Sequence, residues 1–344
     1  MLIIFDMDGV LIDVSKSYRE VTRLSVVRYV QDIIGVNARD EGFITLSDVA
    51  DIKRSGCLNN DWDLTNAIIN AYLGVLFDPY NEHLIHAAKK IPGKGRDTEI
   101  LYSIRGLLKD AERSVLEKAL EEVSAKKIWI DFMNTQDSSI NRGYISPFLI
   151  GQGDVGEGNL SKRIFQELYL GRELFTAIYH ETPIFYKGEG YIEKEELIPD
   201  NSQLKLLGSI HTLSIATGRP RVEAEYALRR FGIEGFFSAL VSEDDVLAAE
   251  RSSCDSFRKP HPFSIEVCIE RSCYRGDGGV YYIGDMPDDM IASRRAGAIP
   301  IGFVNEKASP EEERKRHRNL LIEKGAWRVF GNFEELISFL MEEQ

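Results

Sequence analysis

The chain has 344 residues, of which 43% are hydrophobic and 28% are charged, and its 55 acidic residues against 42 basic ones give a net charge of −13. This length suits two domains, the composition excludes a wholly disordered chain, and no apolar run approaches the roughly 20 residues of a membrane-spanning helix. The negative charge disfavours a broad surface for nucleic acid or anionic membrane, because both partners carry the same sign.

The first residues and the cysteines favour a cytoplasmic protein. Met1 to Phe5 is followed at once by Asp6, which leaves no room for the basic, apolar and cleavage segments of a secretory signal. The 4 cysteines form no C-x-x-C pair and are too few for a disulfide scaffold. We therefore expect reduced thiols and a cytoplasmic location, with the oligomeric state left open.

The chain opens with a short apolar strand at residues 2–5, which ends in a turn at Asp6. The pattern then becomes helical up to about residue 199. Helices are predicted at residues 18–34, at 62–77 behind an Asp61 N-cap, in a segment begun by an Asp97 N-cap, at 114–123 and at 161–179. Residues 16–199 are therefore expected to form a mainly helical domain.

After residue 199 strands and helices alternate. Strands are predicted at residues 211–216, 239–242, 280–284, 299–304 and 327–330, and helices at 221–231, 263–271, 288–296, 310–324 and the C-terminus. Such alternation builds a parallel sheet covered by helices on both faces. The strand at residues 2–5 has to join this sheet to bury its apolar side chains. We therefore expect a doubly wound α/β domain, discontinuous in sequence, formed by residues 1–15 and 200–344.

Polar motifs follow these elements at positions that a parallel sheet brings to one edge, the carboxyl ends of its strands, where ligands bind. The motifs are Asp6-Met7-Asp8-Gly9-Val10-Leu11, Thr217-Gly218-Arg219, Lys259-Pro260, and Gly284-Asp285 with Asp289. Each motif alone is common in turns and at helix starts. Together they bring acidic groups, a hydroxyl and a lysine to one place. Clustered buried carboxylates repel each other unless a cation or a function compensates.

In these four motifs the sequence resembles the haloacid dehalogenase superfamily of phosphotransferases, and residues 16–199 lie where that family has a type-one helical cap. The resemblance implies that Asp6 is the nucleophile and that Asp8 protonates the leaving alcohol and later deprotonates water. It also implies a phosphate-binding set, in which free N–H groups of the first turn act with a hydroxyl and a lysine. The members of this set are Met7, Gly9, Thr217, Gly218 and Lys259.

The resemblance further implies Mg²⁺, which prefers oxygen ligands. The expected ligands are Asp6, the backbone carbonyl of Asp8, and Asp285, with Asp289 acting from nearby through water. A carboxylic acid at position 8 separates the phosphate-transferring members from dehalogenases. The sequence thus predicts a Mg²⁺-dependent phosphatase of a small phosphorylated metabolite, and a phosphomutase stays open as the alternative.

A second glycine motif, Gly151-x-Gly153-x-x-Gly156, matches the dinucleotide-binding fingerprint and raises a NAD(P)-binding oxidoreductase as a weaker alternative. A proline interrupts the strand-like run before it, and no strand ending in an acidic residue follows about 20 residues later. A further hypothesis is that the N–H groups of this loop, with Lys162 or Arg163, bind an anionic part of the substrate.

Overall fold

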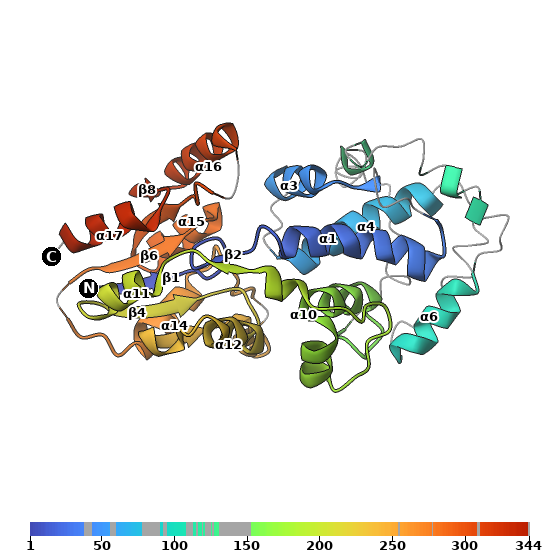
Figure 1. Ribbon diagram of the computed structural model, residues 1–344, viewed down its shortest axis with the longest axis horizontal. Coiled ribbons are helices and arrows are strands. Elements are labelled where there is room, and N and C mark those ends of the chain that lie inside the picture. Colours follow the sequence, from blue (N-terminus) through green and yellow to red (C-terminus); the bar gives the residue numbers. More distant parts are fainter. Residues whose placement is uncertain are drawn as a thin grey trace. The chain divides into compact units, whose positions relative to one another are not determined.

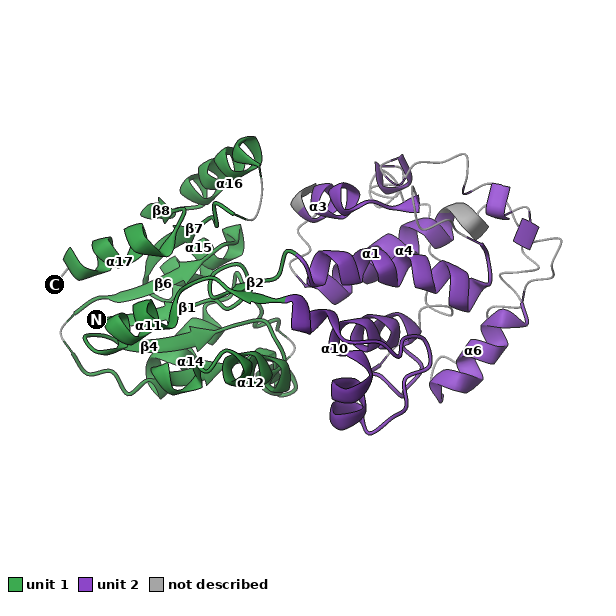
Figure 2. Cartoon of the chain, in the orientation of Figure 1, with its two compact units in different colours: residues 1–15, 195–344 green, residues 16–194 purple. Residues whose placement is uncertain are grey.

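The computed structural model describes residues 1–37, 43–55, 60–77, 90–91, 95–107, 153–253, 255–276, 278–307 and 310–342, with scattered positions between 113 and 130. The chain divides into two compact units, which Figure 2 colours separately. The α/β unit consists of residues 1–15 and 195–344, and the helical unit of residues 16–194. None of the helices in the described part of the chain has the length and apolar content needed to cross a lipid bilayer.

A six-stranded parallel sheet forms the centre of the α/β unit (Figure 1). Its strands lie in the order β5 (Phe237–Val241), β4 (Thr212–Ala216), β1 (Leu2–Phe5), β6 (Val280–Gly284), β7 (Ile299–Phe303) and β8 (Arg328–Phe330). Leu2 is aligned with Thr212 on one side and with Val280 on the other. The first strand of the chain therefore lies in the middle of the sheet, and the predicted doubly wound fold is confirmed.

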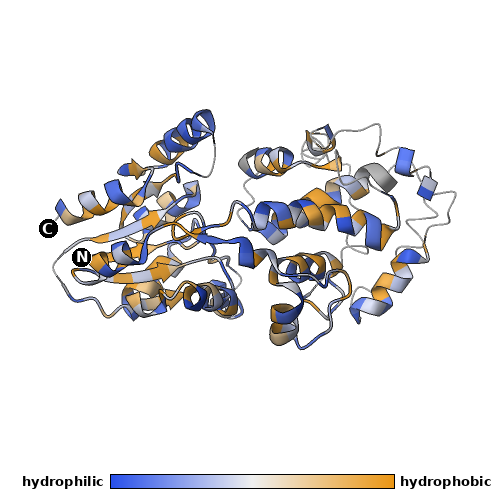
Figure 3. Ribbon diagram, viewed as in Figure 1, coloured by the Kyte–Doolittle hydropathy of each residue, from blue (hydrophilic) through white to orange (hydrophobic). Residues whose placement is uncertain are grey.

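Helices cover both faces of this sheet, because successive side chains of each strand point to opposite faces. Ile3 and Phe5 belong to one buried cluster, to which α11, α12 and α17 contribute, whereas Leu2 and Ile4 belong to another, to which α14 and α15 contribute. α16 buries only Leu321 and is coloured almost entirely as hydrophilic in Figure 3. The bounds are α11 (Asn201–Gly208), α12 (Arg221–Arg230), α14 (Phe263–Arg271), α15 (Pro287–Arg295), α16 (Glu311–Glu323) and α17 (Phe333–Glu342).

Several short elements of this unit were not predicted. Helices α11 and α13 (Glu243–Glu250) each begin with a capping box. In this motif the N-cap side chain accepts a hydrogen bond from the backbone N–H three residues later, and the side chain of that later residue accepts one from the N-cap N–H. Strands β2 (Ile12–Asp13) and β3 (Glu196–Leu197) pair antiparallel, and at two residues each they are too short to show a periodic pattern. This pairing places the return to the α/β unit at residue 195, slightly before residue 200.

The helical unit contains α1, continued by the π-helix Tyr29–Ile34, together with α3, α4, α6 and α10 and, near its end, the 3₁₀ turn Tyr191–Lys194. The bounds are α1 (Tyr18–Arg28), α3 (Leu46–Ser55), α4 (Asp61–Phe77), α6 (Asp97–Arg105) and α10 (Leu160–Tyr179). Asn60, rather than Asp61, caps α4, because its Oδ1 accepts a hydrogen bond from the N–H of Trp62 at 2.8 Å. Half of the positions in the helix predicted at 114–123 lie outside the described residues, and the described ones are helical.

Candidate active site

Loops that follow β1, β4 and β6 meet at the carboxyl edge of the sheet. Asp6 comes directly after β1, Thr217 after β4 and Asp285 after β6. The backbone N–H of Asp6 donates to the carbonyl of Ile283 in β6 at 2.8 Å, which fixes the start of its loop. Because the chain order of the strands reverses beside β1, the loops on its two sides diverge and leave room for a ligand.

Three carboxylates gather at this edge. Single oxygens of Asp6, Asp285 and Asp289 all lie within 4.8 Å of one another. Gly9 has a φ of +76°, and a Cβ at this position would overlap the Asp285 carboxylate, so a side chain here would disrupt the cluster. Nζ of Lys259 lies 3.2 Å from Oδ2 of Asp6 and 2.9 Å from Oδ1 of Asp289. One lysine against three carboxylates leaves an excess of negative charge, and this oxygen donor set fits Mg²⁺.

Tyr282 of β6 connects the members of this cluster and was not identified from the sequence. Its hydroxyl accepts from Nζ of Lys259 at 2.5 Å and donates to Oδ1 of Asp289 at 3.1 Å. Oδ2 of Asp289 accepts from the N–H of Met286 at 3.0 Å. Asp289 is therefore held by three donors, one of which is Lys259, and its role near Mg²⁺ stays a prediction. The signal that was available is a pair of tyrosines, Tyr281 and Tyr282, within a short and largely buried strand.

The surroundings of Asp6 and Lys259 shift their pKa values in the same direction. Burial raises the pKa of Asp6 to about 7, although Lys259 lowers it, and the nearby Asp289 and Asp8 raise it further. Burial alone would lower the pKa of Lys259, but the carboxylates of Asp289 and Asp6 outweigh burial, and the pKa is raised. Lys259 therefore stays protonated, whereas ionised Asp6 is unfavourable without a further positive charge.

The Asp8 carboxylate lies outside the cluster of three and is bound by an arginine. Its Oδ1 accepts from Nε of Arg219 at 2.6 Å and from Nη2 at 2.5 Å. Arg219 is only 1% exposed, and Glu195 accepts from its other edge. The sequence showed Arg219 only as part of a motif and carried no signal for Glu195.

Several N–H groups expected to be free for phosphate already have partners. The N–H of Thr217 donates to a carbonyl of β5 at 2.9 Å, and that of Gly9 donates to a carbonyl within its own turn at 2.8 Å. The N–H of Met7 donates to Oδ1 of Asp6 at 2.8 Å. These N–H groups build the turn and orient Asp6, so they are not free as expected, and their contact with phosphate stays a prediction.

The Thr217 hydroxyl and the backbone at Gly218 remain suitable for an anion. Oγ1 of Thr217 accepts from the N–H of Arg219 at 3.2 Å, so its own hydrogen can point to another acceptor. In the described part of the chain, no atom apart from those of the adjacent residues lies within 4 Å of the point where a Cβ would stand on Gly218. A phosphate oxygen can therefore approach this turn closely.

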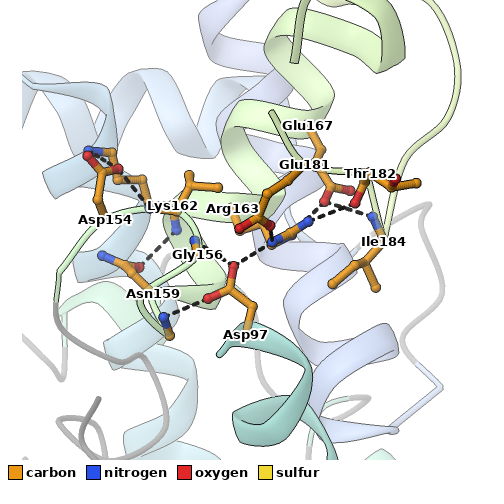
Figure 4. A network of polar contacts seen from close by, with 12 residues as sticks. Asp97, Asp154, Gly156, Asn159, Lys162, Arg163, Glu167, Glu181, Thr182 and Ile184 are labelled. Carbon is orange, nitrogen blue, oxygen red and sulfur yellow. Dashed lines mark hydrogen bonds and ion pairs between the residues drawn. The ribbon is translucent and has the colours of Figure 1, made fainter. Parts of the chain in front are cut away.

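The second glycine motif lies in the helical unit, and its first member, Gly151, falls outside the described residues. The loop before α10 is occupied by a carboxylate of the chain itself (Figure 4). Oδ2 of Asp97 accepts from the N–H of Gly156 at 2.9 Å, and Oδ1 accepts from the N–H of Gly158 at 2.6 Å. Asp97 thus binds this loop instead of capping α6, and Arg96 is the N-cap residue.

The basic residues beside this loop are also engaged (Figure 4). Arg163 is 2% exposed and pairs with Asp97 at 2.7 Å, with Glu167 at 2.8 Å and with Glu181. Lys162 pairs with the carboxylate of residue 154 at 2.9 Å. The hypothesis that this loop binds an anionic substrate is therefore wrong, because the chain supplies the anion. The described part of the helical unit also contains no strand, so the strand–helix–strand context of a dinucleotide site is missing there.

Known proteins resemble this chain in sequence. Residues 201–303 match the family model described as haloacid dehalogenase-like hydrolase. A phosphoglycolate phosphatase of Pasteurella multocida is 28% identical over 123 residues, which are 35% of this chain and 50% of that protein, so the chain spans about half the length of this curated relative.

Two solved structures were found to be similar to this chain, and one of them supports a statement about the fold. A crystal structure of a Northeast Structural Genomics Consortium target has a TM-score of 0.64 at 20% identity, over 99% of both chains, which shows a shared fold. Phosphatase Tt82 from Thermococcus thioreducens has a TM-score of 0.48 at 23% identity, over 86% of this chain and 87% of that one.

Proposed function

We propose that this chain, which belongs to the haloacid dehalogenase-like hydrolases, is a Mg²⁺-dependent phosphatase that hydrolyses a small phosphorylated metabolite through an aspartyl-phosphate. The observation that carries the proposal is the convergence of Asp6, Asp285, Asp289 and Lys259, from opposite ends of the chain, at one edge of the sheet. This cluster combines a nucleophile held in place by hydrogen bonds, the positive charge of the lysine, and an excess of carboxylate charge that suits a metal ion. Together these features suit phosphoryl transfer.

Asp6 is the proposed nucleophile because both of its oxygens are oriented. Oδ1 accepts from the N–H of Met7 at 2.8 Å, and Oδ2 lies 3.2 Å from Nζ of Lys259. An oxygen of Asp6 attacks phosphorus, the bond from phosphorus to the alcohol oxygen breaks, and Asp8 gives that oxygen a proton. Water then attacks phosphorus, Asp8 takes up a proton from it, and inorganic phosphate leaves as the Asp6 carboxylate is regenerated. Dividing the reaction in this way replaces one high barrier by two lower ones.

Other residues of the site neutralise and hold the phosphoryl group. Lys259, anchored at 2.9 Å by Asp289, supplies a fixed positive charge, and the hydroxyl of Thr217 can donate to a phosphate oxygen. Asp6, Asp285 and the backbone carbonyl of Asp8 are the proposed ligands of Mg²⁺. When bound, the ion offsets the repulsion between the anionic nucleophile and the anionic phosphate.

The helical unit is the proposed cap, which would favour small soluble substrates over phosphoproteins. The name of the Pasteurella multocida relative makes phosphoglycolate one candidate substrate. Sugar phosphates, histidinol phosphate and nucleotides are further members of the same chemical class. A phosphomutase would carry the same core chemistry but return an isomerised phosphate ester instead of free phosphate.

The test is phosphate release from p-nitrophenyl phosphate and from a panel of phosphorylated metabolites, with Mg²⁺ and with a chelator. We expect release that requires Mg²⁺ and vanishes in Asp6→Asn, while Asp255→Asn, a change in an exposed loop residue, leaves it intact. An isomerised ester without free phosphate would favour the mutase, and turnover of a nicotinamide cofactor would favour the oxidoreductase. Phosphate release that persists in Asp6→Asn would exclude Asp6 as the nucleophile.

A further inference from the structure

We propose that Arg219 and Glu195 are positioning residues, which hold the acid–base carboxylate of Asp8 at the angle needed for proton transfer. The inference rests on the proposed phosphatase function. It adds a buried pair of side chains that acts on the reaction only through Asp8.

The guanidinium of Arg219 lies between two carboxylates. Nε and Nη2 contact Oδ1 of Asp8 at 2.6 and 2.5 Å, and Nη1 and Nη2 contact the two oxygens of Glu195 at 3.0 Å each. The Arg219 and Glu195 side chains are 1% and 0% exposed, whereas that of Asp8 is 30% exposed. The arginine is therefore fixed by a buried partner on one edge and presents its other edge to the functional carboxylate.

The backbone holds both members of the pair in place. Glu195 directly precedes β3, which pairs with β2 just after the Asp8 turn, and its carbonyl accepts from Nη1 of Arg230 at 3.1 Å. The carbonyl of Arg219 accepts from the N–H of Glu243 at 2.9 Å. Because both backbones are tied to neighbouring elements, the guanidinium has little freedom to move.

The pattern of contacts distinguishes positioning from a simple stabilising ion pair. The arginine meets Glu195 with two parallel bonds, the geometry in which a guanidinium and a carboxylate match best. It meets Asp8 through one oxygen only, Oδ1. The second oxygen of Asp8 is thereby left to exchange a proton with the leaving alcohol or with water, at an orientation set by the first. Lysine could supply the charge but not this planar fork.

The test is a double-mutant cycle that combines Glu195→Gln with Asp8→Asn, at saturating Mg²⁺. Gln keeps the shape of Glu195 but cannot accept two bonds from the guanidinium. We expect Glu195→Gln to lower kcat for an alkyl phosphate about 10- to 100-fold, with KM within about 2-fold, because acid–base catalysis typically contributes 10²–10⁴-fold and depends on placement. In the Asp8→Asn background the same change should alter kcat by less than about 2-fold, because its effect passes through Asp8.

The leaving group gives a second readout, which a merely structural role would not move. p-Nitrophenol leaves without a proton, so in a rapid-mixing experiment its first-turnover release should change by less than about 3-fold in Glu195→Gln. Arg219→Lys should show the same pattern as Glu195→Gln, and it carries the test if the latter does not fold. Glu225→Gln changes a half-exposed carboxylate that pairs with Arg221 and Arg229, away from Asp8, and should leave all rates unchanged.

The outcomes distinguish failure of the positioning role from failure of the proposed phosphatase function. Additive effects in the cycle, or an equal loss for both leaving groups, would overturn the positioning role while leaving the phosphatase in place. Absence of any Mg²⁺-dependent phosphate release by the wild-type protein would instead overturn the proposed function, and the positioning role with it.

Discussion

Replacing Asp6 by asparagine is expected to stabilise the metal-free α/β unit near pH 8 while abolishing activity. Burial raises the pKa of this carboxyl from 3.8 to about 7, so its ionised form is unfavourable in the folded protein. At ~1.4 kcal/mol for each pH unit between these two pKa values, ionised Asp6 costs the folded protein roughly 4 kcal/mol of stability. The N–H of Met7 and Nζ of Lys259 contact different oxygens of the carboxylate, and an amide can accept from only one of them. We therefore expect a net gain of about 1–3 kcal/mol in the free energy of unfolding.

The gain from Asp6→Asn should depend on pH with a definite sign. Below pH 3.8 the carboxyl is protonated in both the folded and the unfolded chain, and the substitution removes no charge. Between pH 3.8 and about 7 the folded chain keeps a proton that the unfolded chain releases, so wild-type stability falls through this window relative to the variant. Urea unfolding with a chelator, near pH 5 and near pH 8, should therefore show the larger difference at the higher pH.

Asp289→Asn is the matched control, because the same chemical change should have the opposite sign. Asp289 accepts from Lys259 at 2.9 Å, from Tyr282 at 3.1 Å and from the N–H of Met286 at 3.0 Å. An amide cannot accept all three bonds, and breaking a buried ion pair costs about 3–5 kcal/mol. If Asp6→Asn lowers the free energy of unfolding near pH 8 as Asp289→Asn does, the reasoning about buried Asp6 is refuted.

Three further substitutions test the neighbouring contacts. Tyr282→Phe removes the hydroxyl that contacts both Lys259 and Asp289. It should lower kcat about 10-fold and the free energy of unfolding by about 1–2 kcal/mol. Unchanged kinetics would contradict a role of Tyr282 in anchoring the lysine. Gly9→Ala places a Cβ against the Asp285 carboxylate at a φ of +76°, so Mg²⁺ should no longer raise the Tm of the variant, whereas it should raise that of the wild type. Arg163→Met leaves the buried Asp97 carboxylate without its cation. In urea unfolding, the free energy of unfolding of the helical unit should fall by about 3–5 kcal/mol. An unchanged free energy of unfolding would contradict a stabilising role of this ion pair.

The regular elements of the α/β unit could be predicted because their signals are local. The apolar run at residues 2–5, the helical spacing and the glycines that end helices reflect how each short segment buries its own side chains. The same reasoning failed where a side chain has two possible partners. Asp97 looks like an N-cap, yet it binds the N–H groups of Gly156 and Gly158, because a loop 59 to 61 residues away offers it two donors.

The sequence alone determined that acidic residues near both ends of the chain meet at one sheet edge, because parallel strands bring their carboxyl ends together. Only the tertiary structure decided which group each of these residues contacts. It placed Tyr282 between Lys259 and Asp289, and Glu195 behind the arginine that holds Asp8. Such partners are chosen by distance and burial in three dimensions, so a buried charge takes whichever donors the fold brings to it, at any separation along the chain.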